Sequence, residues 1–180
     1  MKDLTYKTYV FVEKHLSPID KGIQASHAVI EFYNEAKLWN KIKENSNFDR
    51  WAHFDKTLIL LDGGSVNNLD EIDEILSENL IHHGSFREPD MDNILTAIAV
   101  VVDERVFNRK EYPDYQDWLI KEKKMYFANS EDFYYYFDIS NCNFTNNNIH
   151  KSLYKEWVEF VGGKENVVLR ELINNRKLAR

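Results

Sequence analysis

The sequence predicts an α/β fold in which a small mixed four-stranded sheet is flanked by helices and followed by a helical, aromatic-rich C-terminal extension. Three observations support this. Strand-like and helix-like periods alternate in the first part of the chain, an order that places helices against a sheet. The last two strands are joined by a short connection. After Val102 the segments become aromatic and polar. We therefore expect one α/β domain over residues 1–104 and an extension over 105–180 that packs on this domain or on a second subunit.

The strands of the domain are predicted from short β-rich or apolar runs. Residues 6–13 alternate as a half-buried strand does, and 56–61 form a short apolar run typical of a buried strand. Two more strands are expected at 80–86 and 95–102. Because the connection 87–94 is too short for a helix, the last two strands should be antiparallel.

Helices are predicted between the strands and in the extension. The first should begin with Ser17 as its N-cap and Pro18 in its first turn, and should run to about Trp39. The second covers residues 68–79 and has one apolar face. In the extension we expect helices at 113–124, 151–161 and 164–177, a strand at 133–139 and an Asn-rich loop at 141–148.

Composition narrows the function classes. The formal net charge is −7, which disfavours binding to a duplex DNA backbone. The single cysteine, Cys142, excludes an internal disulfide and a cysteine-cluster metal site. No apolar run approaches the roughly 20 residues of a membrane span, and the N-terminus lacks a signal-peptide pattern. We expect a cytoplasmic protein, in the host cytoplasm if it is viral, that has no membrane partner, cofactor or metal.

The first helix separates into two faces at about 100° per residue. One side is apolar and should pack on the sheet: Ile19, Ile23, Ile30 and Tyr33. The opposite arc, which is mainly polar, carries Asp20, Lys21, Gln24, His27, Ala28 and Glu31. Such an arc is either a solvated face or one wall of a site.

The polar arc contains a family motif. The stretch from Asp20 to Ala28 resembles the helix motif G-K-x-A-A-Q-x-x-H-A of the type-2 peptidyl-tRNA hydrolases, with Gln24, His27 and Ala28 in register. The segment that begins at Leu16 is also similar to bacteriophage proteins of this fold. The resemblance continues in order across the predicted domain, through Trp51, the 56–61 strand, the 68–79 helix, residues 85–88 and residues 96–99.

The resemblance implies a hydrolase whose default substrate is peptidyl-tRNA. The family's functional lysine falls on Asp20, with Lys21 one position later, its functional aspartate falls on Glu88, and one of its two threonines falls on Thr96. In the family, the strand end at Glu88 faces the helix that carries the glutamine and histidine. The expected catalytic residues are His27, Glu88, Lys21 and Thr96, and the expected substrate-binding residues are Gln24, Arg87, Asp20, Asp90 and Asn93. His27 or Glu88 would move a proton, and Lys21 and Arg87 would meet phosphate.

Three further motifs have two interpretations each. Asp62, Gly63, Gly64 and Ser65 form either a tight turn or a phosphate-binding turn before a helix N-terminus. The acidic side chains at positions 88, 90 and 92 form either a polar loop or a site for a general base or divalent ion. The aromatic run 134–137 either stacks on bases or forms a buried or dimer-forming strand.

The histidines are similarly open to interpretation. His27 is as readily a structural histidine as a catalytic one. His82 and His83 should point to opposite faces of a strand, so they cannot form a joint metal pair.

Three functions follow from these observations. The first is a hydrolase of a nucleotide-containing ester or phosphodiester. The second is a phage anti-defence protein that binds or cleaves a small, for example cyclic, nucleotide immune signal. The third is a non-catalytic interaction module that uses the aromatic C-terminal helices. The expected partner is a nucleotide or RNA-end substrate, and we expect a homodimer.

Overall fold

The computed structural model describes residues 3–39, 47–123, 125–130, 133–138, 143–145, 149–174 and 176–180. It divides into two compact units, one formed by Met1–Glu104 and Val168–Arg180 and the other by Arg105–Val167. All of 105–180 was predicted to be an extension, whereas residues from Val168 onward group with the first unit. No helix of the described part is both long and apolar enough to cross a membrane.

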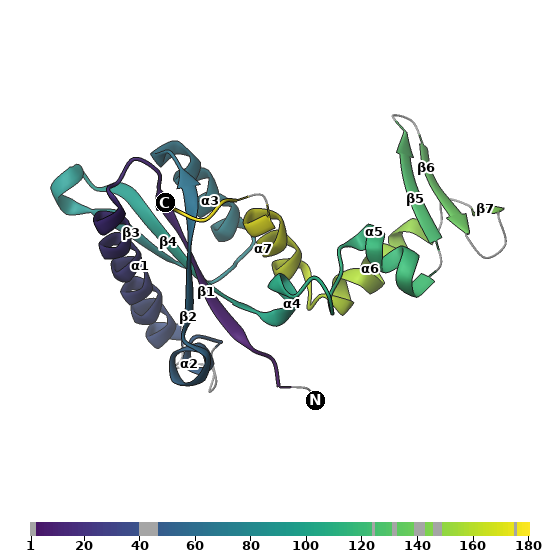
Figure 1. The fold of residues 1–180 in the computed structure, drawn as a ribbon, viewed down its shortest axis with the longest axis horizontal. Helices are drawn as coiled ribbons and strands as arrows, with labels where there is room; N and C mark the ends of the chain where they lie inside the picture. Colours follow the sequence, from purple (N-terminus) through teal and green to yellow (C-terminus); the bar gives the residue numbers. More distant parts are fainter. Residues whose placement is uncertain are drawn as a thin grey trace. The chain divides into compact units, whose positions relative to one another are not determined.

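The first unit is an α/β structure around a mixed four-stranded sheet, as predicted (Figure 1). The strand order is β2-β1-β4-β3. β1 (Tyr6–Glu13) is parallel to β2 (Thr57–Gly64) and antiparallel to β4 (Ile94–Asp103). β3 (Gly84–Glu88) is antiparallel to β4, which confirms the pairing predicted from the short connection.

Two long helices cover the sheet. α1 (Pro18–Trp39) contacts β3, β4 and β1, and α3 (Val66–Glu78) contacts β4, β2 and β1. The predicted start of α1 after Ser17 is confirmed. The remaining elements of this part are α2 (Asn47–Arg50), the π-helical turn η1 (Trp51–Asp55), the 3-10 turn η2 (Pro89–Met91) and, from Val168 onward, α7 (Lys164–Asn174).

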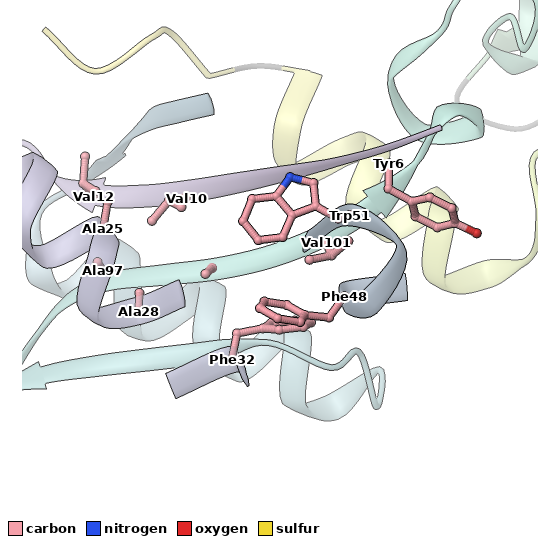
Figure 2. Packing of buried hydrophobic residues seen from close by; sticks show 11 residues of the cluster. Tyr6, Val10, Val12, Ala25, Ala28, Phe32, Phe48, Trp51, Ala97 and Val101 are labelled. Carbon is pink, nitrogen blue, oxygen red and sulfur yellow. The ribbon is translucent and has the colours of Figure 1, made fainter. Parts of the chain in front are cut away.

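An apolar cluster of the first unit lies between α1 and the sheet (Figure 2). It joins side chains of β1, β4, α1, α2 and η1: Tyr6, Val10, Val12, Ala25, Ala28, Phe32, Phe48, Trp51, Ala97, Ala99 and Val101. The Trp51 indole also donates a hydrogen bond of 2.8 Å to the Thr57 carbonyl at the start of β2. This bond fixes the turn that leads from α2 into the sheet.

The predicted inward face of α1 is wrong. The residues expected on the sheet are exposed: Ile19 76%, Ile23 46%, Ile30 53% and Tyr33 43%. The buried side instead carries Ala25, Ala28 and Phe32. The reason is close approach to β3, where a Cβ at Gly84 would lie 2.2 Å from the Phe32 nitrogen and 2.5 Å from the Ala28 carbonyl oxygen. Small side chains fit where the helix and strand backbones nearly touch, so size selects the buried face.

β3 begins later than predicted because the end of α3 uses the preceding residues. Leu80 adopts a left-handed conformation with φ of 55°. Its N–H donates to the Ser77 carbonyl, and the Ile81 N–H donates to the Leu76 carbonyl. This pattern is a Schellman helix cap, which satisfies the last carbonyl groups of a helix. Residues 80–81 therefore belong to the cap of α3 rather than to a strand.

Residues 176–180, which we call the C-terminal tail, pair with the β2 edge of the sheet. Leu178 forms an antiparallel bridge with Leu61. The Ala179 N–H donates a hydrogen bond of 3.0 Å to the Leu60 carbonyl. The tail thus covers an edge strand whose backbone groups would otherwise face solvent.

Arg176 anchors the start of the C-terminal tail. Its guanidinium donates to the carbonyl oxygens of Asp62, at 3.2 Å, and Gly63, at 3.1 Å. The same group lies 5.4 Å from the centre of the Phe11 ring, in cation–π geometry. The Asp62 N–H donates to the Lys177 carbonyl at 2.9 Å. These contacts hold the tail in one register against the end of β2.

The second unit contains an antiparallel sheet of order β5-β6-β7, formed by β5 (Met125–Ser130), β6 (Phe133–Asp138) and β7 (Asn143–Thr145). Its helical elements are α4 (Glu104–Phe107) apart from its first residue, α5 (Tyr115–Trp118), the π-helical segment η3 (Leu119–Lys123), α6 (Ile149–Phe160) and α7 as far as Val167. An apolar cluster packs these helices: Trp118, Leu119, Leu153, Trp157, Val161 and Val167.

The predictions for this unit are confirmed in part. The predicted strand at 133–139 is present as β6, although residue 139 lies outside the described residues. The prediction of a loop over 141–148 is wrong at 143–145, because β7 pairs there with β6. The side chains of the aromatic run 134–137 also lie outside the described part, so base stacking by this run stays a prediction.

Candidate functional site

A chain of hydrogen bonds links α1, β3 and β4. The Gln24 amide donates from Nε2 to Glu88 Oε2 at 2.6 Å. The Thr96 hydroxyl donates to Gln24 Oε1 at 3.2 Å. We call this group the polar chain. Gln24 and Thr96 are buried, and Glu88 is half-buried at the end of its strand.

The strand period explains why Glu88 meets α1. Gly84 and Phe86 of β3 lie against this helix, the first beneath Phe32 and the second stacked on His27. Side chains two residues apart point to the same side of a strand. Glu88 continues this row and reaches Gln24, as the family resemblance implies for this strand end.

Hydrogen-bond chemistry orients the Gln24 amide of the polar chain. A carboxylate only accepts hydrogen bonds, so the Gln24 NH2 group must face Glu88 and its oxygen must face Thr96. The Thr96 hydroxyl has a single proton, and its other nearby acceptor is the Phe86 carbonyl at 3.3 Å. Glu88 Oε1 is 3.5 Å from the Asp90 N–H, a long and weak contact. Oε1 is therefore the oxygen best placed to accept a proton from a bound water molecule.

Lys21 lies one helical turn before Gln24 and is only 8% exposed. Its Nζ donates a hydrogen bond of 2.8 Å to the backbone oxygen of Arg180. Lys21 also lines a pocket of about 350 Å³, together with Lys14, Asp62, Lys177, Leu178 and Arg180. The structure thus places this predicted site residue between the polar chain and a strongly basic pocket.

His27 and Arg87 lie outside the polar chain. The exposed His27 ring stacks on Phe86, with the ring centres 4.5 Å apart and the planes at 19°. Arg87 points toward α3, where its guanidinium donates to Asp70 at 3.1 Å and lies 3.9 Å from Asp73. The structure therefore separates Arg87 from the residues with which it was predicted to share a pocket.

The other predicted binding residues have local structural roles. The Ser17 hydroxyl donates a hydrogen bond of 2.6 Å to the Asp20 carboxylate, and the backbone N–H of Asp20 donates one of 3.2 Å to the Ser17 hydroxyl oxygen. This is a helix N-terminal cap. Asp90 is exposed in η2. Asn93 is exposed with φ of 57°, and its N–H donates to the Glu88 carbonyl at 3.0 Å.

The structure bears on two motifs that the sequence left with two interpretations each, the turn at 62–65 and the acidic segment around Glu88. The Gly64 and Ser65 N–H groups donate to the side chains of Asp62, at 2.8 Å, and Asn68, at 3.0 Å. Donors used inside the turn do not bind a phosphate, which favours the tight-turn interpretation. Among the residues that the structure describes, no three metal-ligating side chains gather, so the acidic segment around Glu88 forms no such cluster.

His83 belongs to a second polar group that the sequence did not reveal. Its Nδ1 faces the Ile81 carbonyl at 2.7 Å, and its Nε2 faces Asp73 Oδ1 at 3.1 Å. The Ser85 hydroxyl also donates to Asp73. Because both ring nitrogens face acceptors, this geometry suits the doubly protonated imidazolium.

The pKa values of the pair shift accordingly. Burial by itself lowers the pKa of His83, but the hydrogen bond to Asp73, the Ile81 carbonyl and the nearby carboxylates outweigh it and raise the pKa above its ordinary value. The hydrogen bond from His83 lowers the pKa of Asp73, against the opposing effect of burial. No sequence signal connects these residues, which come from α3 and from the segment before β3.

The basic residues around Lys21 were also missed. Lys14 follows β1, and Lys177 and Arg180 lie in the C-terminal tail, far from Lys21 in sequence. One signal could have found the tail: the segment 176–180 has three basic residues in a chain of net charge −7. Its pairing with β2 was not evident from the pattern.

No protein-family model matches the chain, and a search of curated proteins finds no similar sequence.

Proposed function

We propose that the protein is a hydrolase of the type-2 peptidyl-tRNA hydrolase fold that cleaves an ester or phosphodiester bond in a nucleotide-containing substrate, with peptidyl-tRNA as the default. The observation that carries this proposal is the polar chain, in which buried Thr96 and Gln24 orient the Glu88 carboxylate. The order of strands and helices, the position of Glu88 at a strand end and its contact with α1 all agree with the resemblance.

Glu88 is the proposed general base. Oε1 removes a proton from a water molecule, and the water oxygen attacks the carbonyl carbon or phosphorus of the substrate. The bond to the leaving oxygen then breaks, and that oxygen takes up a proton. The exposed His27 ring, stacked beside the end of β3, is the candidate donor of this proton. Protons and electrons balance, because one water molecule is consumed and no oxidant or cofactor enters.

Thr96 and Gln24 act as positioning residues. The Thr96 side chain is fully buried, so it reaches Glu88 through Gln24 and does not touch substrate. An amide held at both ends keeps the carboxylate in one orientation without reorganisation during the reaction. The buried Lys21 ammonium supplies positive charge next to this group and would stabilise charge that develops on the substrate.

A small nucleotide signal is the second candidate substrate. The basic pocket has a volume of about 350 Å³, within the range of about 300–1,000 Å³ that small-molecule sites occupy. The net charge of −7 opposes the extended phosphate contacts that a whole tRNA would make. These two observations favour a phage anti-defence protein that cleaves or binds a small nucleotide.

We also propose that α1 mediates the expected homodimer. Its exposed apolar side chains are Ile19, Ile23, Ile30 and Tyr33. With Ser26 they repeat at alternating intervals of four and three residues, the spacing that fits one helix against another. A second copy of α1 presents the same row and can pack against it around a two-fold axis.

A ligand screen with product analysis tests the proposed activity. Cyclic and linear mono- and dinucleotides, deacylated tRNA and an N-acetylated aminoacyl-tRNA would be incubated with wild type and with the double variant Gln24→Ala, His27→Ala. A ligand at 100 times its Kd adds about 2.7 kcal/mol of stability, which a thermal shift detects. The proposal requires turnover by wild type and its loss in the double variant, while His53→Ala, which removes an exposed histidine of η1, retains it. Equal turnover by the folded double variant would remove this site from consideration.

A further inference from the structure

We infer that the C-terminal tail completes an oxyanion site, in which Lys177 and Arg180 join Lys14 and Lys21 to bind a phosphate group of the substrate. The inference rests on the proposed function for the choice of a phosphate-bearing substrate, and it names the groups that recognise it. Neither Lys177 nor Arg180 belongs to the motif that resembles the hydrolase family.

The charge of the pocket carries the inference. Four basic side chains line it against one acidic side chain, Asp62, although the chain as a whole has a net charge of −7. A second pocket of about 590 Å³, which shares Asp62 and Lys177 with the first, provides a comparison. There Arg176 and Lys177 are balanced by Asp62 and Glu171. The excess of positive charge is therefore specific to the smaller pocket, and such a cluster attracts a phosphate group.

Lys21 is buried, so the positive charge of the pocket does not come from solvated surface side chains alone. A lysine ammonium is costly to bury unless polar groups compensate it. The partner seen for Lys21 is the main-chain oxygen of Arg180, 2.8 Å from Nζ. A phosphate group in the pocket would bring a full negative charge to this ammonium group.

The backbone of the tail fixes the two added cations. Leu178, between them, bridges Leu61 of β2, and the neighbouring Ala179 N–H donates to Leu60. These contacts involve the backbone, so substitution of the Lys177 and Arg180 side chains leaves the pairing of the tail intact.

The position of the pocket links recognition to chemistry. Lys21 and Gln24 are three residues apart on α1, where Cβ atoms are about 5–6 Å apart. Gln24 in turn holds Glu88 at 2.6 Å. A phosphate group of the substrate that binds Lys21 would therefore bring its neighbouring ester bonds close to Glu88, the proposed general base. The predicted substrate class is one in which the cleaved ester lies within a few bonds of a phosphate, as in a small nucleotide.

Binding of inorganic pyrophosphate, measured by titration calorimetry at low salt, tests the inference. The test variant is Lys177→Gln, Arg180→Gln, and the control is Lys151→Gln, Lys164→Gln, which removes the same charge from two exposed lysines of the second unit. We expect wild type and control to bind with similar Kd. The test variant should bind at least roughly tenfold more weakly, because it lacks two charge-assisted contacts.

The other outcomes are equally informative. Absence of pyrophosphate binding by wild type, or equal weakening in both double variants, would overturn the inference. The same titration on Glu88→Gln separates it from the proposed activity. If this variant and wild type bind pyrophosphate alike, and no substrate of the panel is cleaved, the anion site stands and the hydrolase proposal fails.

Discussion

Gly84 sets the distance between α1 and β3, and Gly84→Ala should therefore disturb both stability and the polar chain. A Cβ at this position would lie 2.2 Å from the Phe32 nitrogen, which is 1.2 Å closer than the 3.4 Å of an ordinary contact. Its other near neighbours are the Ala28 carbonyl oxygen at 2.5 Å and the Phe32 Cα at 2.6 Å. All three are backbone atoms, so rotation of a side chain cannot relieve the clash.

The expected loss of stability is about 1–3 kcal/mol, the usual range for overpacking a core. This corresponds to a fall in Tm of roughly 2–12 °C for a chain of this size. Displacement of α1 by about 1 Å would also stretch the hydrogen bond of 2.6 Å between Gln24 and Glu88, so turnover should fall in protein that remains folded.

Gly22→Ala is the matched control on the same helix. A Cβ there meets nothing within 4 Å. Alanine is the better helix former by about 1 kcal/mol, so this variant should be as stable as wild type or more so. Calorimetric unfolding and the turnover assay check both variants. If Gly84→Ala matches Gly22→Ala in Tm and in rate, the close approach of α1 and β3 does not hold in solution.

Three further predictions follow from the same contacts. Thr96→Val leaves the buried Gln24 oxygen without its hydrogen-bond donor, so the free energy of unfolding should fall by about 1–3 kcal/mol and kcat should fall at constant KM. Thr96→Ser keeps the hydroxyl and should retain the stability and the kcat of wild type. A fully active valine variant would contradict the positioning role of Thr96. The raised pKa of His83 means that its ion pair with Asp73 stabilises the fold at pH below about 6.5 and that this stabilisation is lost as pH rises through the folded pKa. Urea unfolding at pH 6 and pH 9 should therefore show that the free energy of unfolding falls more for wild type than for His83→Gln as the pH rises. An equal fall in both proteins would refute the ion pair between His83 and Asp73. Ile23→Asp in the exposed row of α1 should convert a dimer to a monomer in sedimentation velocity, and a monomeric wild type would remove α1 as the dimer surface.

The strand and helix order of the first unit was predictable because burial on the sheet leaves a strong pattern. β1 was predicted at its observed bounds, and β4 within one residue at each end. Both strands are buried along most of their length, which demands β-branched and apolar side chains. The tail at the β2 edge was not predictable, since its bonds to Leu60 and Asp62 use backbone groups that any sequence possesses.

The orientation of α1 shows where pattern analysis fails. Hydrophobicity favours Ile19 and Ile23 as the inward side chains, yet the sheet comes so close at Gly84 that Ala25 and Ala28 occupy the interface. Arg87 was predicted to share a pocket with Gln24 because it lies next to Glu88 at a strand end. Its side chain instead points to the opposite face of the strand, where it binds Asp70 of α3.

Single-turnover cleavage distinguishes Glu88 as the proposed general base from Glu88 as a structural carboxylate. Single-turnover cleavage of an N-acetylated aminoacyl-tRNA and of a cyclic dinucleotide would be compared in wild type, Glu88→Gln and Glu74→Gln, an exposed carboxylate on α3. Removal of a general base should slow cleavage by about 10²–10⁴-fold in Glu88→Gln, with Glu74→Gln unchanged. Cleavage by Glu88→Gln at the wild-type rate, or no cleavage of either substrate by wild type, would contradict the account.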